Sequence, residues 1–171
     1  MEIGEKMKKP KLVIFRGKPT SGKSTAYGSL RKNKLMKDWI FVDHVALKES
    51  MGKELGKKSL FAVLKVVMPT KKNIIIEEMS SDTVRRNISS VIKKYNYEIK
   101  VFQFTVRTKT AYKRDVQRVR AKKAIKMGKE LIDEMHKMHD EKLDKNGIIV
   151  DTNKLGKRQV VDLIVKSLGL K

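Results

Sequence analysis

A short glycine-containing stretch has residue types at a spacing suited to binding phosphate. Residues 17–25 read GKPTSGKST and match the pattern G-x-x-x-x-G-K-[ST] at every position. The glycines let the backbone curl so that successive N–H groups point at one phosphate. Lys23 would neutralise β- and γ-phosphate oxygens, and the Ser24 hydroxyl would ligate Mg²⁺. The stretch predicts a site for a nucleoside triphosphate such as ATP, formed by Gly17, Lys18, Pro19, Thr20, Ser21, Gly22, Lys23, Ser24 and Thr25.

Carboxylates at the ends of two apolar runs could act on the group that accepts a phosphoryl group. Asp43 ends the run that begins at Trp39. Ligands of doubly wound sheets lie beyond the carboxyl ends of the strands, so Asp43 could take the proton from an attacking hydroxyl. The same aspartate could instead be only a turn or helix-cap residue. Glu77 and Glu78 end the run that begins at Asn73. One of them could hold the water shell of Mg²⁺ or the acceptor, and strand parity decides which.

The richest basic stretch, residues 101–129, contains ten lysines and arginines and a single acid, Asp115. Arg114 and Arg118 are four residues apart and share one face of a predicted helix. Arginines on a mobile segment can cover a transferring phosphoryl group and stabilise its charge. The alternative is a solvated basic helix.

Two histidines, His136 and His139, are three residues apart and could hold a metal in geometry alone. The helix expected around them already has an apolar stripe on one face and mixed charge on the other. We therefore expect no metal at the histidines, and Ser24 stays the predicted metal ligand.

Strand-like runs alternate with helical segments along the whole chain. Short β-branched runs predict five buried strands, at 11–15, 39–43, 73–78, 98–104 and 147–151. Helices are predicted at about 23–33, 47–67 with a break near Gly56, 82–95, 111–126, 129–145 and 157–168. This order predicts an α/β fold, a five-stranded parallel sheet with helices on both faces. The run 98–104 alternates in part and is expected nearer a sheet edge.

Length and composition limit the number of domains, the cellular location and the kind of partner. The chain of 171 residues has 41 lysines and arginines against 19 acids, a formal net charge of +22, and no cysteine. Its length and 40% apolar content fit a single domain over residues 1–171. The lack of cysteine excludes disulfides and thiol nucleophiles. Without a membrane-length apolar run or a signal-peptide pattern, we expect a cytoplasmic protein with no membrane contact. The charge favours a polyanionic partner such as nucleic acid, with a solubilising surface as the alternative.

Several segments together give a family resemblance. The chain resembles the small P-loop kinases grouped with the 5′-hydroxyl polynucleotide kinase domain of bacteriophage end-healing enzymes, over about residues 11–168. The phosphate-binding loop is the most general element of the resemblance. The segments that carry it further are FVDH at 41–44, IEEMSSDTVRR at 76–86, KRDVQR at 113–118 and IIVDTN at 148–153.

The resemblance implies a three-layer P-loop kinase fold and a role for each matching residue. Asp43 falls at the position of the family's general base, which deprotonates a 5′-hydroxyl. Arg114 and Arg118 fall at the start of a helical lid, here about residues 107–129, whose arginines approach the ATP phosphates. Asn153 falls in the loop that passes beside the adenine.

On the acceptor side the match is less complete. The resemblance assigns Glu78 and Arg85 to acceptor binding, but Glu78 stands where an aspartate is usual. The polynucleotide kinases have an arginine shortly after the general base that holds the 3′-phosphate of the acceptor. Here that place is Ala46, and the nearest cation is Lys48. The donor chemistry is therefore better supported than the identity of the acceptor.

The leading functional hypothesis is ATP- and Mg²⁺-dependent phosphoryl transfer to the 5′-hydroxyl end of RNA or DNA. Lys23 and Ser24 would hold the donor, Asp43 would act as the base, and Arg114 and Arg118 would clamp the transferring group. One alternative is a small-molecule kinase on the same scaffold, with a metabolite, antibiotic or amino-sugar acceptor. Another is a nucleic-acid-binding NTPase that transfers no phosphoryl group. The preferred triphosphate, the end geometry and the oligomeric state stay open.

Overall fold

In the computed structural model, the described residues are 9–77, 81–121, 126–140, 144 and 146–170, with the backbone alone for 81–85. Five strands form one parallel sheet in the order β2-β3-β1-β4-β5. Their bounds are β1 Lys11–Gly17, β2 Ile40–Val42, β3 Ile74–Glu77, β4 Glu98–Thr105 and β5 Ile148–Asp151. The predicted parallel sheet is confirmed, since each strand overlaps one of the five apolar runs.

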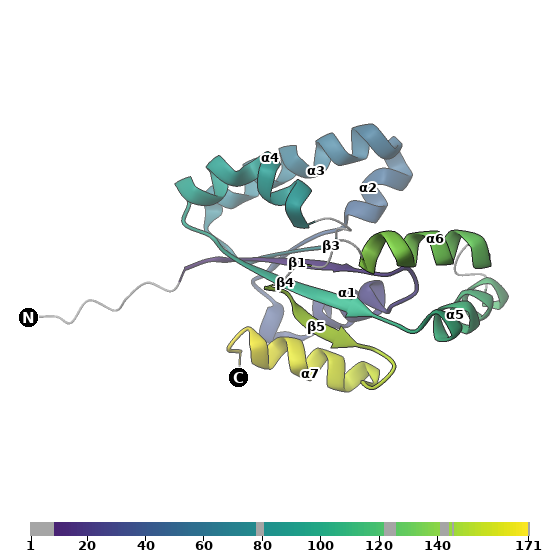
Figure 1. Cartoon of the computed structure of the whole chain (residues 1–171). Coiled ribbons are helices and arrows are strands. Elements are labelled where there is room, and N and C mark those ends of the chain that lie inside the picture. The colour runs from purple at the N-terminus through teal and green to yellow at the C-terminus, as the bar shows by residue number, and fades with distance from the viewer. Residues whose placement is uncertain (1–8, 78–80, 122–125, 141–143, 145, 171) are drawn as a thin grey trace, which may run out of the picture.

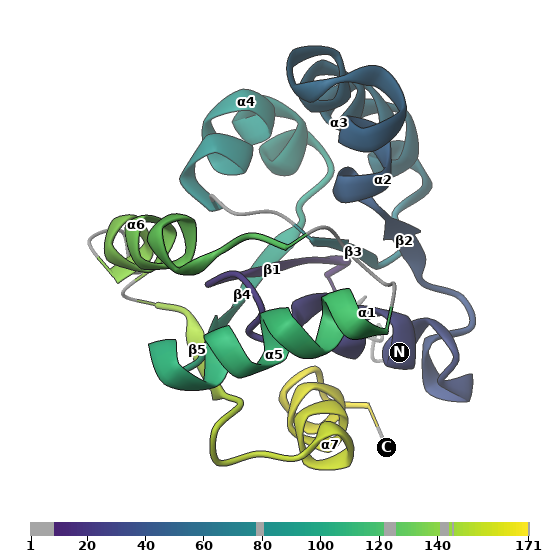
Figure 2. The same ribbon diagram turned by 90° about the vertical axis from the view of Figure 1, so that its right-hand side faces the viewer.

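Helices cover both faces of this sheet, as predicted. Figures 1 and 2 show α1 and α7 on one face, and α2, α3 and α4 on the other. The remaining helices, α5 and α6, lie toward the carboxyl ends of the strands. The bounds are α1 Lys23–Arg31, α2 His44–Met51, α3 Lys53–Val67, α4 Ser81–Lys94, α5 Thr108–Arg120, α6 Lys129–Asp140 and α7 Lys157–Ser167, with 3₁₀ turns at Lys34–Met36 and Met68–Thr70.

The central strand β1 divides the core into two layers. Val13 and Phe15 pack with α1 and α7, while Leu12 and Ile14 pack with α3 and α4. All four side chains are fully buried. Successive side chains of a strand point to opposite faces, so a strand covered on both faces must be apolar at every position. This is why β1 shows a continuous apolar run.

The strand β4 is internal, between β1 and β5. The expectation that residues 98–104 lie nearer a sheet edge is correct only for the first half of the strand. Its pairing with β5 involves residues 102–105, whereas β1 pairs along residues 98–104. Residues 98–101 therefore have a described neighbour on one side only, and the exposed Glu98 lies there. The partial alternation in the sequence reflects this local edge.

The predicted helix break near Gly56 is wrong in position. The chain breaks at Gly52, whose φ of 80° and ψ of 164° end α2 and start α3. Gly56 lies inside α3, where a Cβ would come within 2.7 Å of the Lys48 Cα. The glycine thus permits close packing of α2 on α3 and does not interrupt the helix. The lid helix is also displaced from the predicted 111–126, because α5 runs from Thr108 to Arg120.

The first and last described residues, Lys9 and Leu170, belong to the end of the sheet where the strands begin, and the carboxyl ends of the strands face α5 and α6 (Figure 1). No helix in the described parts of the chain combines the length and the apolar character needed to cross a bilayer.

Candidate functional site

The phosphate-binding loop joins β1 to α1. Its backbone is curled, as its glycines were expected to allow. A side chain on Gly17 would overlap the carbonyl oxygen of Phe104, so the close approach of β4 requires glycine. Gly22 has a φ of 90°, which favours glycine, and it directly precedes α1. Thr20 also has a positive φ, 57°, and its hydroxyl donates to the Pro19 carbonyl at 2.7 Å. The amino end of α1 therefore faces the concave side of the loop, which favours an anion there.

Lys23 turns back onto the loop that precedes it. Its Nζ donates to the carbonyl oxygens of Gly17 at 2.8 Å and Lys18 at 3.0 Å. Burial lowers the pKa of Lys23 to about 8, against the attraction of Glu77, and Arg118 lowers it further. A cation with so depressed a pKa is stabilised strongly by a phosphate placed beside it.

Ser24 and Glu77 form the neighbouring pair. The Ser24 hydroxyl donates to Glu77 Oε1 at 3.0 Å. Glu77 ends β3 and is buried, and this burial raises the pKa of its carboxyl above the ordinary value, with Asp43 adding to the effect and Lys23 and Ser24 opposing it. Strand parity thus directs Glu77 into the site. Glu78, the predicted acceptor ligand, lies outside the described residues.

The oxygen atoms of this pair suit a small hard cation. A hydroxyl and a carboxylate are ligands that Mg²⁺ accepts, and it usually takes one or two protein oxygens together with substrate phosphates and water. The described residues contain no cluster of three or more histidine, cysteine, aspartate or glutamate side chains that could hold a metal ion. Ser24 and Glu77 therefore fit Mg²⁺ that arrives with a nucleotide, and His136 and His139 are not part of a described metal cluster.

Asp43 is both a helix cap and a site residue. Its carboxylate accepts a hydrogen bond from Ala46 N at 3.0 Å and so caps α2. It also lines a cavity of about 280 Å³ together with Ser24, Tyr27 and Glu77. Burial, reinforced by Asp43, raises the pKa of the Tyr27 phenol. The two interpretations left open by the sequence are compatible, because the cap leaves Asp43 Oδ2 available.

The same cavity is acidic. Its charged lining comprises three carboxylates, Asp43, Glu49 and Glu77, and one guanidinium, Arg31. Ala46, which stands where the polynucleotide kinases have an arginine, also lines it. The predicted acceptor residue Arg85 belongs to α4, on the far side of β3, and nothing is described of its side chain.

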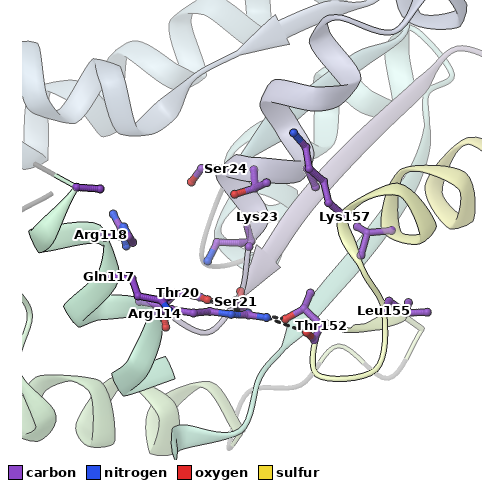
Figure 3. A pocket seen from close by; sticks show the side chains of 15 residues that line it. Thr20, Ser21, Lys23, Ser24, Arg114, Gln117, Arg118, Thr152, Leu155 and Lys157 are labelled. Carbon is purple, nitrogen blue, oxygen red and sulfur yellow. Dashed lines mark hydrogen bonds between the residues drawn. The ribbon is translucent and has the colours of Figure 1, made fainter. Parts of the chain in front are cut away.

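A larger cavity of about 710 Å³ adjoins the loop on its other side (Figure 3). It is bounded by the phosphate-binding loop with the start of α1, by α5, and by the segment from β5 into α7. Its lining residues are Thr20, Ser21, Gly22, Lys23, Ser24, Thr25, Ala26, Arg114, Gln117, Arg118, Ala121, Thr152, Leu155, Lys157 and Val160. Ser24 is common to both cavities, so the two meet at the predicted metal ligand.

The two predicted lid arginines line this cavity in different ways. Arg114 donates to Thr152 Oγ1 at 2.9 Å, to the Thr152 carbonyl at 2.8 Å and to the Thr20 carbonyl at 3.2 Å. It therefore fixes α5 to the phosphate-binding loop and to the turn after β5. Arg118 is exposed and makes no hydrogen bond to the described part of the chain; in Figure 3 its guanidinium lies to the left of Lys23, across the open space of the cavity. Arg118 is free to meet a ligand, whereas Arg114 positions the walls.

Two other predicted nucleotide ligands point elsewhere. Lys18 Nζ forms an ion pair with Asp140 Oδ2 of α6 at 2.7 Å. Asn153 accepts from Arg107 N at 3.1 Å and donates twice to Asp151, so it fixes the turn beside the cavity and does not line it. Gly17, Lys18 and Pro19 shape the loop without lining the cavity.

Sequence reasoning did not single out the apolar end of the larger cavity. Leu155 and Val160 lie there, with Lys157 and Thr152 beside them. These residues could have been predicted to line a site, because they follow the fifth strand and so lie at the same edge of the sheet as the phosphate-binding loop. Thr152 belongs to the segment expected beside the adenine, Val160 to the predicted helix 157–168, and Leu155 lies between the two.

The fold is shared with solved P-loop kinases. A protein of Chloroflexus aurantiacus assigned as a kinase superposes with a TM-score of 0.68 at 16% identity, over 95% of this chain and 98% of that one. A gluconokinase from Sinorhizobium meliloti gives 0.63 at 13% identity, over 95% and 93%. The Pnkp1/Rnl/Hen1 RNA repair complex includes a chain that gives 0.57 at 22% identity, over 80% of this chain and 47% of that one.

A scan against protein-family models and a search of curated proteins both find no match. The structural likenesses, all below 25% identity, show the fold alone. The chain therefore has the three-layer α/β fold of the P-loop kinases, as predicted, and its activity must be argued from the residues of its own site.

Proposed function

We propose that this protein is a kinase that transfers the γ-phosphoryl group of a nucleoside triphosphate to a hydroxyl group of a small acceptor. The observation that carries the proposal is the meeting of the two cavities at Ser24. The larger one has the phosphate-binding loop, Lys23 and Arg118, and the smaller one has Asp43. A donor and an acceptor bound on the two sides would meet between them.

In this mechanism each residue acts on one group. Lys23 would leave the loop carbonyls for the β- and γ-phosphate oxygens, and Arg118 would neutralise the charge of the transferring group. Ser24 and Glu77 would hold Mg²⁺, which when bound offsets charge on the phosphate oxygens. Asp43 would take the proton of the acceptor hydroxyl. That oxygen then bonds to the γ-phosphorus while the bond to the bridging oxygen breaks, leaving a phosphate ester and a nucleoside diphosphate.

The smaller cavity supports a small hydroxylated acceptor. Carboxylates accept hydrogen bonds from hydroxyl and ammonium groups and repel phosphates. Asp43, Glu49 and Glu77 outnumber Arg31, so an acceptor rich in hydroxyl groups, or one with an amino group, fits better than a phosphodiester. The likeness to a gluconokinase and to a sugar kinase from Janibacter sp. HTCC2649 agrees with this acceptor class.

Transfer of ³²P from [γ-³²P]ATP with Mg²⁺ tests the proposal, with polyols, sugars and amino sugars as acceptors. Lys23→Ala should abolish transfer, a loss of at least about 10²-fold in kcat, because the phosphate oxygens lose a preorganised cation. Asp43→Asn should keep ATP binding yet lower kcat about 10²- to 10⁴-fold, because the proton has no acceptor. Asp38→Asn, an exposed acid remote from both cavities, is the matched control. Near-full transfer by Asp43→Asn would remove the general base from the mechanism.

A second candidate, 5′-hydroxyl ends of RNA or DNA as acceptors, is favoured by one observation. The net charge of +22 exceeds what a small acceptor requires. Oligonucleotides with a 5′-hydroxyl belong in the same assay. Label in the oligonucleotide that disappears with Asp43→Asn would establish this acceptor instead, and release of free phosphate alone would indicate an NTPase.

A further inference from the structure

Among the described residues, exposed lysines far outnumber exposed acids at the end of the sheet where the strands begin. Described acids gather near the carboxyl ends of the strands and on α6, among them Asp43, Glu77 and Asp115. In the described segments at the opposite end of the sheet, where the strands begin, the exposed acids are Asp38 and Glu98. Nine exposed lysines belong to the segments at that end: Lys9, Lys32, Lys34, Lys37, Lys71, Lys72, Lys93, Lys94 and Lys166. We call this set the amino-end face.

The topology places these lysines together. In a parallel sheet every helix-to-strand connection returns to the edge where the strands begin. The lysines therefore come from the segment before β1, the connections before β2, β3 and β4, and the end of α7. In Figure 1 this edge is the one beside the first and last described residues, turned away from α5 and α6.

Hydrogen bonds show that the connections are neighbours. Glu98 N donates to the Pro10 carbonyl at 2.8 Å, and Lys11 N donates to Asn73 Oδ1 at 2.8 Å. Ile40 N reaches the Asn73 carbonyl at 2.9 Å. The Tyr97 hydroxyl donates to the Lys72 carbonyl at 2.7 Å. At the α7 end, Lys100 Nζ reaches the Ser167 carbonyl at 3.0 Å. One continuous surface results, about 20 Å across at a strand spacing of ~4.8 Å.

We propose that the amino-end face binds nucleic acid at a site separate from the two cavities. Several lysines on one face can each neutralise a phosphate of a polynucleotide, whose phosphates repeat every ~3.4 Å along each strand. All nine cations are lysines, point charges that contact phosphate without the forked geometry that reads bases. The nucleic acid is therefore bound without sequence preference. This proposal does not depend on the proposed kinase activity.

Binding of a fluorescein-labelled 20-nucleotide RNA that has a 5′-phosphate, measured by anisotropy without nucleotide, tests the proposal. The 5′-phosphate prevents the RNA from serving as an acceptor. The variant K34Q/K37Q/K72Q/K93Q removes four charges from the amino-end face. The variant K53Q/K57Q/K58Q/K109Q removes four exposed charges away from the amino-end face, three of them on α3 and one on α5. It is the matched control and is called the α3 variant.

The proposal predicts at least tenfold weaker binding for the amino-end variant and a salt slope reduced by about 3, since each lost contact contributes ~0.7. The α3 variant should stay within twofold of the wild type. An equal loss in both variants would show that binding follows net charge alone and would overturn the proposal. So would no RNA binding by the wild type, or binding only to vesicles of 70% phosphatidylcholine and 30% phosphatidylserine. If the first variant fails to fold, K9Q/K32Q/K94Q/K166Q takes its place.

Discussion

At the scale of single residues, the phosphate-binding loop is occupied by its own lysine. Lys23 donates to the Gly17 and Lys18 carbonyls, and its pKa is lowered to about 8. In the proposed function, nucleotide binding would exchange these two carbonyl contacts for phosphate contacts. The exchange is favourable only for a ligand whose charge reaches Lys23, which selects for a β- or γ-phosphate over a monophosphate.

A proton-uptake measurement follows from this pKa. At pH 8.5 Lys23 is mostly neutral in the free protein, and a phosphate group raises its pKa, so ATP binding should take up at most about 0.8 of a proton per nucleotide. Calorimetry in two buffers of different ionisation enthalpy measures this uptake. Lys23→Arg keeps its charge at this pH and should bind without it. The same uptake in Lys23→Arg would assign the proton to another group.

The phosphate-binding loop could be predicted from the sequence, but not all of the residues that contact it. The motif defined the loop at residues 17–25, because its pattern lies in adjacent residues, and residues 20–25 of it line the larger cavity. Glu77 and Glu78 could not be separated, because a shift of one residue in the strand reverses which side chain faces the site. The role of Arg114 was also out of reach, since its partner Thr152 lies 38 residues away.

At the scale of elements, glycine has two different uses where α2 meets α3. Gly52 supplies a backbone conformation that ends one helix and starts the next. Gly56 supplies space, with the Lys48 backbone at the position its side chain would need. A glycine in a helical pattern is ambiguous from sequence, since a break and a close approach give the same signal.

Alanine substitution separates these uses. Gly56→Ala should lower the free energy of unfolding by about 1–3 kcal/mol, because a Cβ forces α2 and α3 apart. Gly28→Ala in α1, where a Cβ meets nothing within 4 Å, should raise it by ~0.5–1 kcal/mol through lower entropy of the unfolded chain. Urea unfolding monitored by circular dichroism measures both. A neutral Gly56→Ala would mean that α2 adjusts freely.

At the scale of the whole molecule, none of the nine lysines of the amino-end face lines either cavity. The cations that line the two cavities are Lys23, Arg31, Arg114, Arg118 and Lys157. A net charge of +22 therefore does not require that the acceptor be a polyanion. The parallel sheet was predictable from the order of apolar runs, but the amino-end face was not, since it emerges only when distant connections meet at one edge.

Salt dependence would report which acceptor the proposed kinase uses. With saturating ATP, the KM of a small uncharged acceptor should change less than about twofold between 50 and 300 mM KCl, since no phosphate contacts are broken. An oligonucleotide acceptor held by several cations should show a KM at least tenfold higher at the upper concentration. Steady-state kinetics at both concentrations makes the distinction, and a steep rise for a polyol would contradict the neutral-acceptor assignment.

The central position of β1 in the sheet also delays its pairing during synthesis. Of the five strands β1 is made first, yet its neighbours are β3 and β4, which end at residues 77 and 105. A nascent chain shorter than this leaves Leu12, Val13, Ile14 and Phe15 with at least one unpaired edge, a template for aggregation. The lysines on either side of that run, and the repulsion between highly charged chains, oppose such association until the sheet closes.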